Sequence, residues 1–196
     1  MFFTKIYLRF LPTLCFSDRL WENVGMVGKY PMHKFFFSGS TAAKIDEKGR
    51  FVLPQGMRFG LVENGVLEFS LGLGLGGCLA IYRQSDIQRI VAKFQEKSHL
   101  GKYQKFFTLF FSTLYQTTCD KIGRVHVPST LRKAVGITSE IVIAGVLNKI
   151  EIWPKKEYDT QLEAVLSGKD VDMNLTKLTE EAFALLEKPE EEVDDA

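Results

Sequence analysis

One pattern of residues occurs twice in the chain, and this duplication limits the possible folds more than any other feature. The first copy is Asp-Glu-Lys-Gly-Arg at 46–50, and the second is Asp-Lys-Ile-Gly-Arg at 120–124. After each Gly-Arg come two β-forming residues around a variable position, then proline, and further on a second arginine, Arg58 or Arg132. A constant offset relates the matching positions. A lone Asp-x-x-Gly-Arg is common by chance, but this longer shared pattern indicates an internal repeat.

Each copy predicts a tight turn that leads into a short strand. Aspartate is favoured at the first position of a type I turn and glycine at the last. The predicted turn-forming residues are Asp46, Gly49, Asp120 and Gly123. Side chains alternate along a strand, so the two apolar residues after each motif arginine should face a core while the arginine faces solvent. Each proline should then end its strand, because it cannot donate to the ladder.

Composition and charge are compatible with a phosphate-facing surface. The chain has 196 residues, of which 45% are hydrophobic, enough for one ordinary domain or two small ones. Formal net charge is only +1, but acidic residues are concentrated at 187–196, so the remainder of the chain is basic. No apolar run approaches the ~18 residues that a membrane span requires, so we expect no membrane partner.

The cysteines and the N-terminal residues indicate the cellular compartment in which the protein is expected. Cys15, Cys78 and Cys119 lie far apart, which favours reduced thiols in a cytoplasmic protein. Residues 1–16 are apolar enough to suggest a signal peptide, but two basic residues interrupt them and no small-residue cleavage site follows. We interpret this stretch as part of an extension that is disordered or that results from a start codon assigned too far upstream.

Changes in residue pattern divide the chain into six parts. Apolar residues at helical spacing, a phenylalanine stripe at 106–111 among them, separate two β-rich units. The expected organisation is an N-terminal extension at 1–35, a first repeat at 36–85, a helical connector at 86–114, a second repeat at 115–157, C-terminal helices at 158–188 and an acidic tail at 189–196. In each repeat we expect a strand, the turn motif, a short strand, a helical turn and a hairpin. The first hairpin should join the apolar runs 66–71 and 78–82.

Enzyme chemistry and metal binding have little support in the sequence. Glycines 72, 74 and 77 match the spacing of a dinucleotide fingerprint, but the residues that follow predict a strand where that fingerprint needs a helix. The histidines are scattered, and no Cys/His pair has metal-ligand spacing. His126 is expected on the same strand face as Arg124. Its side chain is either simply solvated or in contact with a phosphate. The phenylalanine stripe fits a core or a subunit interface. We therefore expect neither catalysis nor a cofactor.

The motif arginines are the strongest candidates for a binding role. Arg50 and Arg124 could be exposed or paired with their own turn aspartates, which would have no functional meaning. Duplication favours function, because two equivalent positions suit a ligand that repeats, as double-stranded DNA does. Arginine can bond bidentately to guanine in the major groove. Lys48 and Lys121 stand beside the arginines and could neutralise phosphates.

These residues also carry a resemblance to a known family. The chain is similar to the MraZ family of bacterial regulators of the division and cell-wall gene cluster, in the SpoVT/AbrB superfamily. The resemblance covers roughly residues 37–158. Its markers are Phe37-Ser38-Gly39, Asp46 to Arg50 with Pro54, Cys78-Leu79 with Ile81-Tyr82, Asp120 to Arg124 with Pro128, Leu131-Arg132, Val142-Ile143 with Gly145, and Asn148 to Trp153.

The resemblance implies an α+β fold of tandem swapped-hairpin AbrB-like half-barrels, a double-split β-barrel, with connecting and C-terminal helices. It also implies a ring-shaped homo-oligomer in the cytoplasm, associated with the nucleoid. Such a protein binds direct promoter repeats, usually as a repressor, and its DNA-contacting arginines map onto Arg50 and Arg124. The alternative hypothesis is a β-barrel protein-interaction or antitoxin-like module without sequence-specific DNA binding. The extension at 1–35 and the acidic tail lie outside the family pattern.

Overall fold

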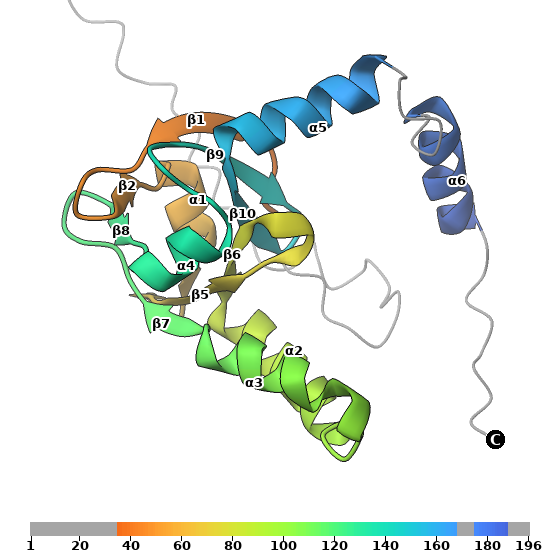
Figure 1. The fold of residues 1–196 in the computed structure, drawn as a ribbon, viewed down its shortest axis with the longest axis horizontal. Coiled ribbons are helices and arrows are strands. Elements are labelled where there is room, and N and C mark those ends of the chain that lie inside the picture. Colours follow the sequence, from red (N-terminus) through yellow and green to blue (C-terminus); the bar gives the residue numbers. More distant parts are fainter. Residues whose placement is uncertain (1–34, 168–174, 188–196) are drawn as a thin grey trace, which may run out of the picture. The chain divides into compact units, whose positions relative to one another are not determined.

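The computed structural model describes residues 35–167 and 175–187 of the chain, which form a mixed α and β fold with antiparallel strands (Figure 1). The expectations for residues 1–34 and for the tail at 189–196 lie outside the described residues. The strands are β1 (Ser40–Lys44), β2 (Arg50–Val52), β3 (Val62–Glu63), β4 (Val66–Leu67), β5 (Phe69–Leu73), β6 (Leu79–Arg83), β7 (Tyr115–Thr117), β8 (Arg124–His126), β9 (Glu140–Val146) and β10 (Lys149–Pro154). The helices are α1 (Gln55–Gly60), α2 (Gln84–Glu96), α3 (Gln104–Ser112), α4 (Ser129–Ala134), α5 (Lys155–Ser167) and α6 (Leu175–Glu187), with short 3-10 helices at Leu75–Gly77 and Gly101–Tyr103.

The main sheet mixes strands from both repeats. Its order is β1-β9-β10-β6-β5-β7, and all neighbours are antiparallel. β1 precedes the first turn motif but pairs with β9 of the second repeat, while β7 precedes the second motif and pairs with β5 of the first. Each repeat therefore supplies its first strand to the hairpin of the other.

The strands after the two turn motifs form a separate two-stranded ribbon, β2–β8. Its register places Phe51 opposite Val125 at the centre. A proline follows soon after each strand, and both prolines have the fixed φ of −53°. α1 and α4 start at the residue after the proline. Each repeat therefore has the same order of elements: the turn, the short strand, the proline and the short helix.

The core confirms the alternation expected after each motif arginine. Phe51, Leu53, Val125 and Val127 are at most 1% exposed and belong to one apolar cluster with the hairpin strands. Their positions on the inner face of the ribbon leave the motif arginines on its outer face. Burial of these side chains fixes which way the ribbon faces, because a slip of one residue would exchange the two faces.

The first repeat has a small hairpin that the apolar pattern did not indicate. The run 66–71 was expected to be one strand, but it is divided between β4 and β5 at Glu68. β3 and β4 pair across Asn64-Gly65, and both turn residues have positive φ, of 52° and 78°. Asn-Gly is a strong signal for a two-residue hairpin, so the local sequence contained the information. The hairpin of β5 and β6 that we expected across the glycines is confirmed, and a strand, not a helix, follows Gly77.

The connector contains the two expected helices, α2 and α3, which meet through aromatic rings. The Phe94 ring of α2 lies 5.4–6.2 Å, between ring centroids, from four phenylalanine rings of α3. The stripe is not part of the main core, because α3 has no buried residue and Phe106 remains 44% exposed. Among the described residues, no helix has the length and apolar character that crossing a membrane requires.

Candidate nucleic-acid interface

The two motif turns have the same hydrogen-bond geometry. In the first, the Gly49 amide donates to the Asp46 carbonyl at 2.8 Å; in the second, the Gly123 amide donates to the Asp120 carbonyl at 2.9 Å. Both glycines have positive φ, of 76° and 84°, a conformation that side chains disfavour. The arginine of each motif follows this glycine directly, at the first position of β2 or β8.

Each aspartate binds both the backbone and the side chain of its own arginine. Asp46 accepts from the Arg50 amide at 2.9 Å, and from the guanidinium Nε and Nη2 at 2.9 and 2.7 Å. Asp120 accepts from the Arg124 amide at 2.9 Å and from its Nε at 2.7 Å. The sequence left open whether the arginines pair with these aspartates. They do, and they also remain at the surface, with 29% and 33% of their side chains exposed.

The arginines alter the acidity of both aspartates. The side-chain hydrogen bond from Arg50 lowers the pKa of Asp46, and the backbone amide of Arg50 contributes in the same direction. For Asp120, the backbone hydrogen bond from Arg124 is the main cause of a lowered pKa, followed by the side-chain bond. Both carboxyls are thus charged at neutral pH and hold their guanidinium groups in place.

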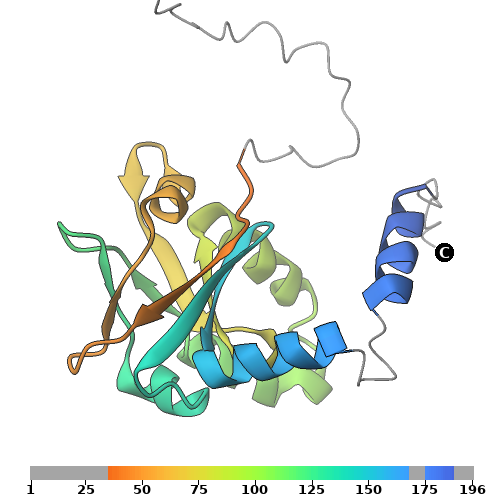
Figure 2. The same cartoon turned by 90° about the horizontal axis from the view of Figure 1, so that it is seen from above.

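The ribbon brings the two arginines onto one face. Arg50 is the Cα partner of His126, and Arg124 is the Cα partner of Val52. Since alternate residues share a face, these four side chains lie on the face opposite the buried Phe51 and Val125. Arg50 and Arg124 are diagonal neighbours, a relation that separates side chains by about 7–8 Å. The two turns themselves lie apart, on either side of the ribbon (Figure 2).

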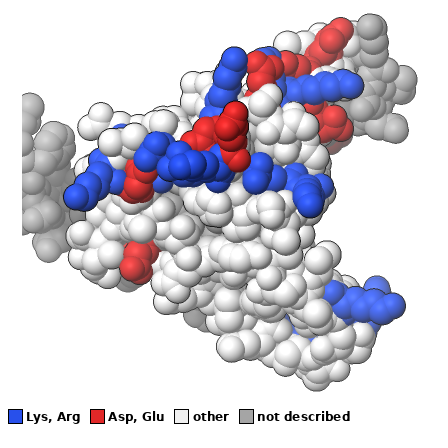
Figure 3. All heavy atoms as spheres, turned by 60° about the vertical axis from the view of Figure 1, so that its left-hand side comes forward, with Lys and Arg blue, Asp and Glu red and all other residues white. Residues whose placement is uncertain are grey.

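The expected phosphate-binding lysines, Lys48 and Lys121, are exposed in the two turns. They do not occupy equivalent positions, because the counterpart of Lys48 is Ile122 and that of Lys121 is Glu47. Figure 3 turns the end of the molecule with β2 and β8 toward the reader: lysines and arginines form a band across it, with acidic side chains among them. The positive surface is therefore interrupted and modest.

The contacts of Arg58 and Arg132 could not be predicted from the sequence. Arg58 comes from α1 in the first repeat, yet its guanidinium packs against Gly123 in the turn of the second repeat. Arg132, from α4, packs against Gly49 in the same way. The only sequence signal was the constant spacing between the two arginines of each copy, which gave no indication of the contact partner.

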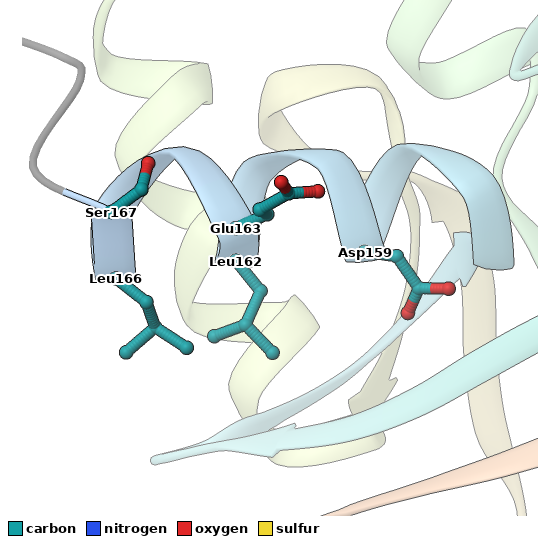
Figure 4. A pocket seen from close by; sticks show the side chains of 5 residues that line it. All are labelled: Asp159, Leu162, Glu163, Leu166 and Ser167. Atoms are coloured by element: carbon teal, nitrogen blue, oxygen red, sulfur yellow. The ribbon is translucent and has the colours of Figure 1, made fainter.

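Other features of the described residues give little support to a different site. No group of three or more His, Cys, Asp or Glu residues among them is arranged to hold a metal ion. An open hollow runs along one side of α5, where all five lining side chains come from that single helix (Figure 4). Burial raises the pKa of the Cys78 thiol to about 12, which makes it a poor nucleophile.

A comparison with models of protein families places the chain in one of them. The family model of MraZ, described as an antitoxin-like protein, matches residues 36–108 and again residues 110–184. Each match contains one turn motif and one long hairpin, β5–β6 in the first and β9–β10 in the second, so the family repeat coincides with the duplication seen in the sequence and in the strands. Because the two matches together span most of the chain, the protein belongs to the MraZ family.

Proposed function

We propose that this protein is a sequence-specific DNA-binding transcriptional regulator that reads promoter repeats through Arg50 and Arg124. The observation that carries the proposal is the placement of both arginines, partly exposed and ion-paired, on one face of the β2–β8 ribbon. A guanidinium has five N–H donors, and the aspartate uses only part of them. The remaining donors are available for the O6 and N7 acceptors of guanine.

The ion pairs support readout by fixing the arginines before DNA arrives. A free arginine side chain loses rotamer entropy when it is ordered at an interface. Asp46 and Asp120 hold the guanidinium groups already, which reduces that cost. A separation of about 7–8 Å between diagonal side chains corresponds to about two base-pair steps of 3.4 Å. Both arginines can thus address bases within one groove.

Lys48 and Lys121 complete the proposed contact by neutralising phosphates on either side of the arginines. Their contribution is independent of base sequence and sensitive to salt. We further propose a ring-shaped homo-oligomer, in which successive copies of the ribbon meet successive repeats and gain affinity through multivalency. The exchange of strands between repeats supports a swapped-hairpin barrel as the scaffold of each protomer.

The proposed setting is the cytoplasm, associated with the nucleoid, and the proposed target is the promoter of the division and cell-wall gene cluster. Family membership supports a regulator, and repression of that cluster is the outcome we propose. Neither a cofactor nor a catalytic step forms part of this function.

Footprinting on the DNA just upstream of this protein's own reading frame tests the proposal. We expect the wild-type protein to protect short direct repeats. Arg50→Ala and Arg124→Ala should each weaken binding by about 1–3 kcal/mol and relax the preference for particular bases. Lys155→Ala is the matched control, since it removes a basic residue from an exposed ion pair on α5. If both arginine variants protect the repeats as well as the wild type does, the proposal is wrong.

A second candidate function is a protein-interaction or antitoxin-like module that acts through α3. Phe106, Leu109 and Phe111 are 44%, 55% and 38% exposed, an unusual set of apolar side chains for one short helix. A steep loss of DNA affinity with salt, together with preference for repeat-bearing DNA, would contradict this alternative as the main function.

A further inference from the structure

The contact between the second arginine of each copy and the turn of the other copy is the basis of this inference. A Cβ placed on Gly123 would lie 2.6 Å from Cζ of Arg58, and one placed on Gly49 would lie 3.1 Å from Cζ of Arg132. Distances this short mean that each guanidinium lies directly on the backbone of the glycine. Both glycines are buried, although the turns to which they belong are exposed.

Main-chain hydrogen bonds join the same partners. The Leu53 amide donates to the Gly123 carbonyl at 2.9 Å, and the Val127 amide donates to the Gly49 carbonyl at 2.8 Å. The helix of one repeat and the residue that follows its short strand therefore both reach the turn of the other. The relation is reciprocal, as expected if the duplicated halves are related by an approximate twofold axis.

Each guanidinium, of Arg58 or of Arg132, packs on its glycine with a buried Nε that makes no hydrogen bond to the described residues. A planar guanidinium can stack on a peptide plane, whereas the ammonium of lysine cannot. Glycine at the contact is favoured by its positive φ, and a Cβ added there would press against the guanidinium, which would have to shift.

We propose that Arg58 and Arg132 are positioning residues that act between the repeats. Arg58 of the first repeat holds the turn that presents Arg124, and Arg132 of the second repeat holds the turn that presents Arg50. This inference rests on the proposed function, because it assigns a role in the DNA contact to two residues that need not touch DNA. It also explains why the spacing from one arginine to the next is the same in both copies.

Double-mutant cycles for binding to the protected promoter DNA test the crossed arrangement. Arg58→Met should weaken binding on the order of tenfold, and its effect should be lost when Arg124 is already alanine. In contrast, the loss of binding free energy caused by Arg58→Met should add in full to the loss caused by Arg50→Ala. Arg132→Met should show the opposite pattern, non-additive with Arg50→Ala and additive with Arg124→Ala. Additivity in all four pairs would overturn the proposal.

Arg58→Lys separates positioning from direct phosphate contact. Lysine keeps the charge but loses the planar group, so we expect Arg58→Lys to bind about as weakly as Arg58→Met. If lysine restores affinity and Arg58→Met lowers the dependence on salt, Arg58 contacts phosphate and the positioning role is wrong. Thermal unfolding of each variant shows whether the effect on DNA binding exceeds any general loss of stability.

A measurement without DNA distinguishes failure of this inference from failure of the proposed function. NMR titration of the carboxyl groups should show that Arg58→Lys, which keeps the positive charge, raises the pKa of Asp120, because the Arg124 hydrogen bonds loosen, and leaves Asp46 unchanged. Arg132→Lys should raise the pKa of Asp46 alone. If this pattern holds while the wild type does not bind promoter DNA, the positioning stands and the proposed function fails. If neither carboxyl responds, the positioning is wrong.

Discussion

The two motif turns differ in sequence at their variable positions and agree in geometry at the others. The turn hydrogen bonds from glycine to aspartate differ by only 0.1 Å, and those from the arginine amide to the carboxylate are both 2.9 Å. The arginine side chains are exposed to a similar degree, at 29% and 33%. Aspartate, glycine and arginine therefore determine the shape of the turn, whatever stands between them.

The variable positions decide the chemistry of the surface around each arginine. Lys48 in the first turn corresponds to Ile122 in the second, and Val52 on the ribbon corresponds to His126. All four side chains are exposed. Two copies of one scaffold thus present arginine in two different chemical settings.

The largest effect should come from the positions that are buried in both copies, such as Leu53 and its counterpart Val127. We expect Leu53→Ala to lower the free energy of unfolding by about 2–5 kcal/mol, because a fully buried side chain leaves a cavity. Val52→Ala, at the neighbouring position on the exposed face, should change it by no more than about 0.5 kcal/mol. Chemical denaturation measures both. Similar costs for the two would contradict the assignment of faces on the ribbon.

The glycine of the second turn should be the next most sensitive position. Gly123→Ala introduces a side chain at a φ of 84° and against Arg58, so we expect it to destabilise the protein by about 1–3 kcal/mol. Gly136→Ala is the control: its φ is 72°, but no atom lies within 4 Å of the added Cβ. A smaller effect at Gly123 than at Gly136 in thermal or chemical unfolding would show that the guanidinium moves aside easily.

A smaller effect should distinguish the exposed positions of the two turns. Lys48→Ala should reduce the slope of log K against log salt for DNA binding by about 0.9, the value for one phosphate contact. Ile122→Ala, at the equivalent position, should leave the slope unchanged. Titrations of promoter DNA at several salt concentrations provide the measurement. Equal slopes for the Lys48→Ala variant and the wild type would remove Lys48 from the proposed contact.

The smallest effect concerns acid pH. The pKa of Asp46 is lower in the folded protein than in the unfolded chain, so its stabilising contribution is complete above the unfolded value of about 3.9 and is lost as pH falls through the folded value. Arg50→Ala should raise the pKa of Asp46 and leave that of Asp120 unchanged, as followed by NMR. A shift at Asp120 instead would mean that the ion pairs form between the repeats.

Much of the local structure could be predicted from the sequence because it depends on neighbouring residues. The turns, the short strands and the direction of Phe51 and Leu53 follow from turn preferences and alternation. The β3–β4 hairpin was missed since its strands are only two residues long, although Asn64-Gly65 signals it. The exposure of the phenylalanine stripe on α3 was not predictable, because helical spacing is the same for a core and for a surface.

The sequence by itself determined the duplication, the shared geometry of the two turns and the inward face of each short strand, because these depend on residues within one turn or one strand of each other. Only the tertiary structure decided which turn each outlying arginine reaches. Arg58 and Arg132 contact the opposite copy because the ribbon pairs β2 with β8 across the repeats. Spacing along the chain carries no information about a partner that pairing between distant strands brings near.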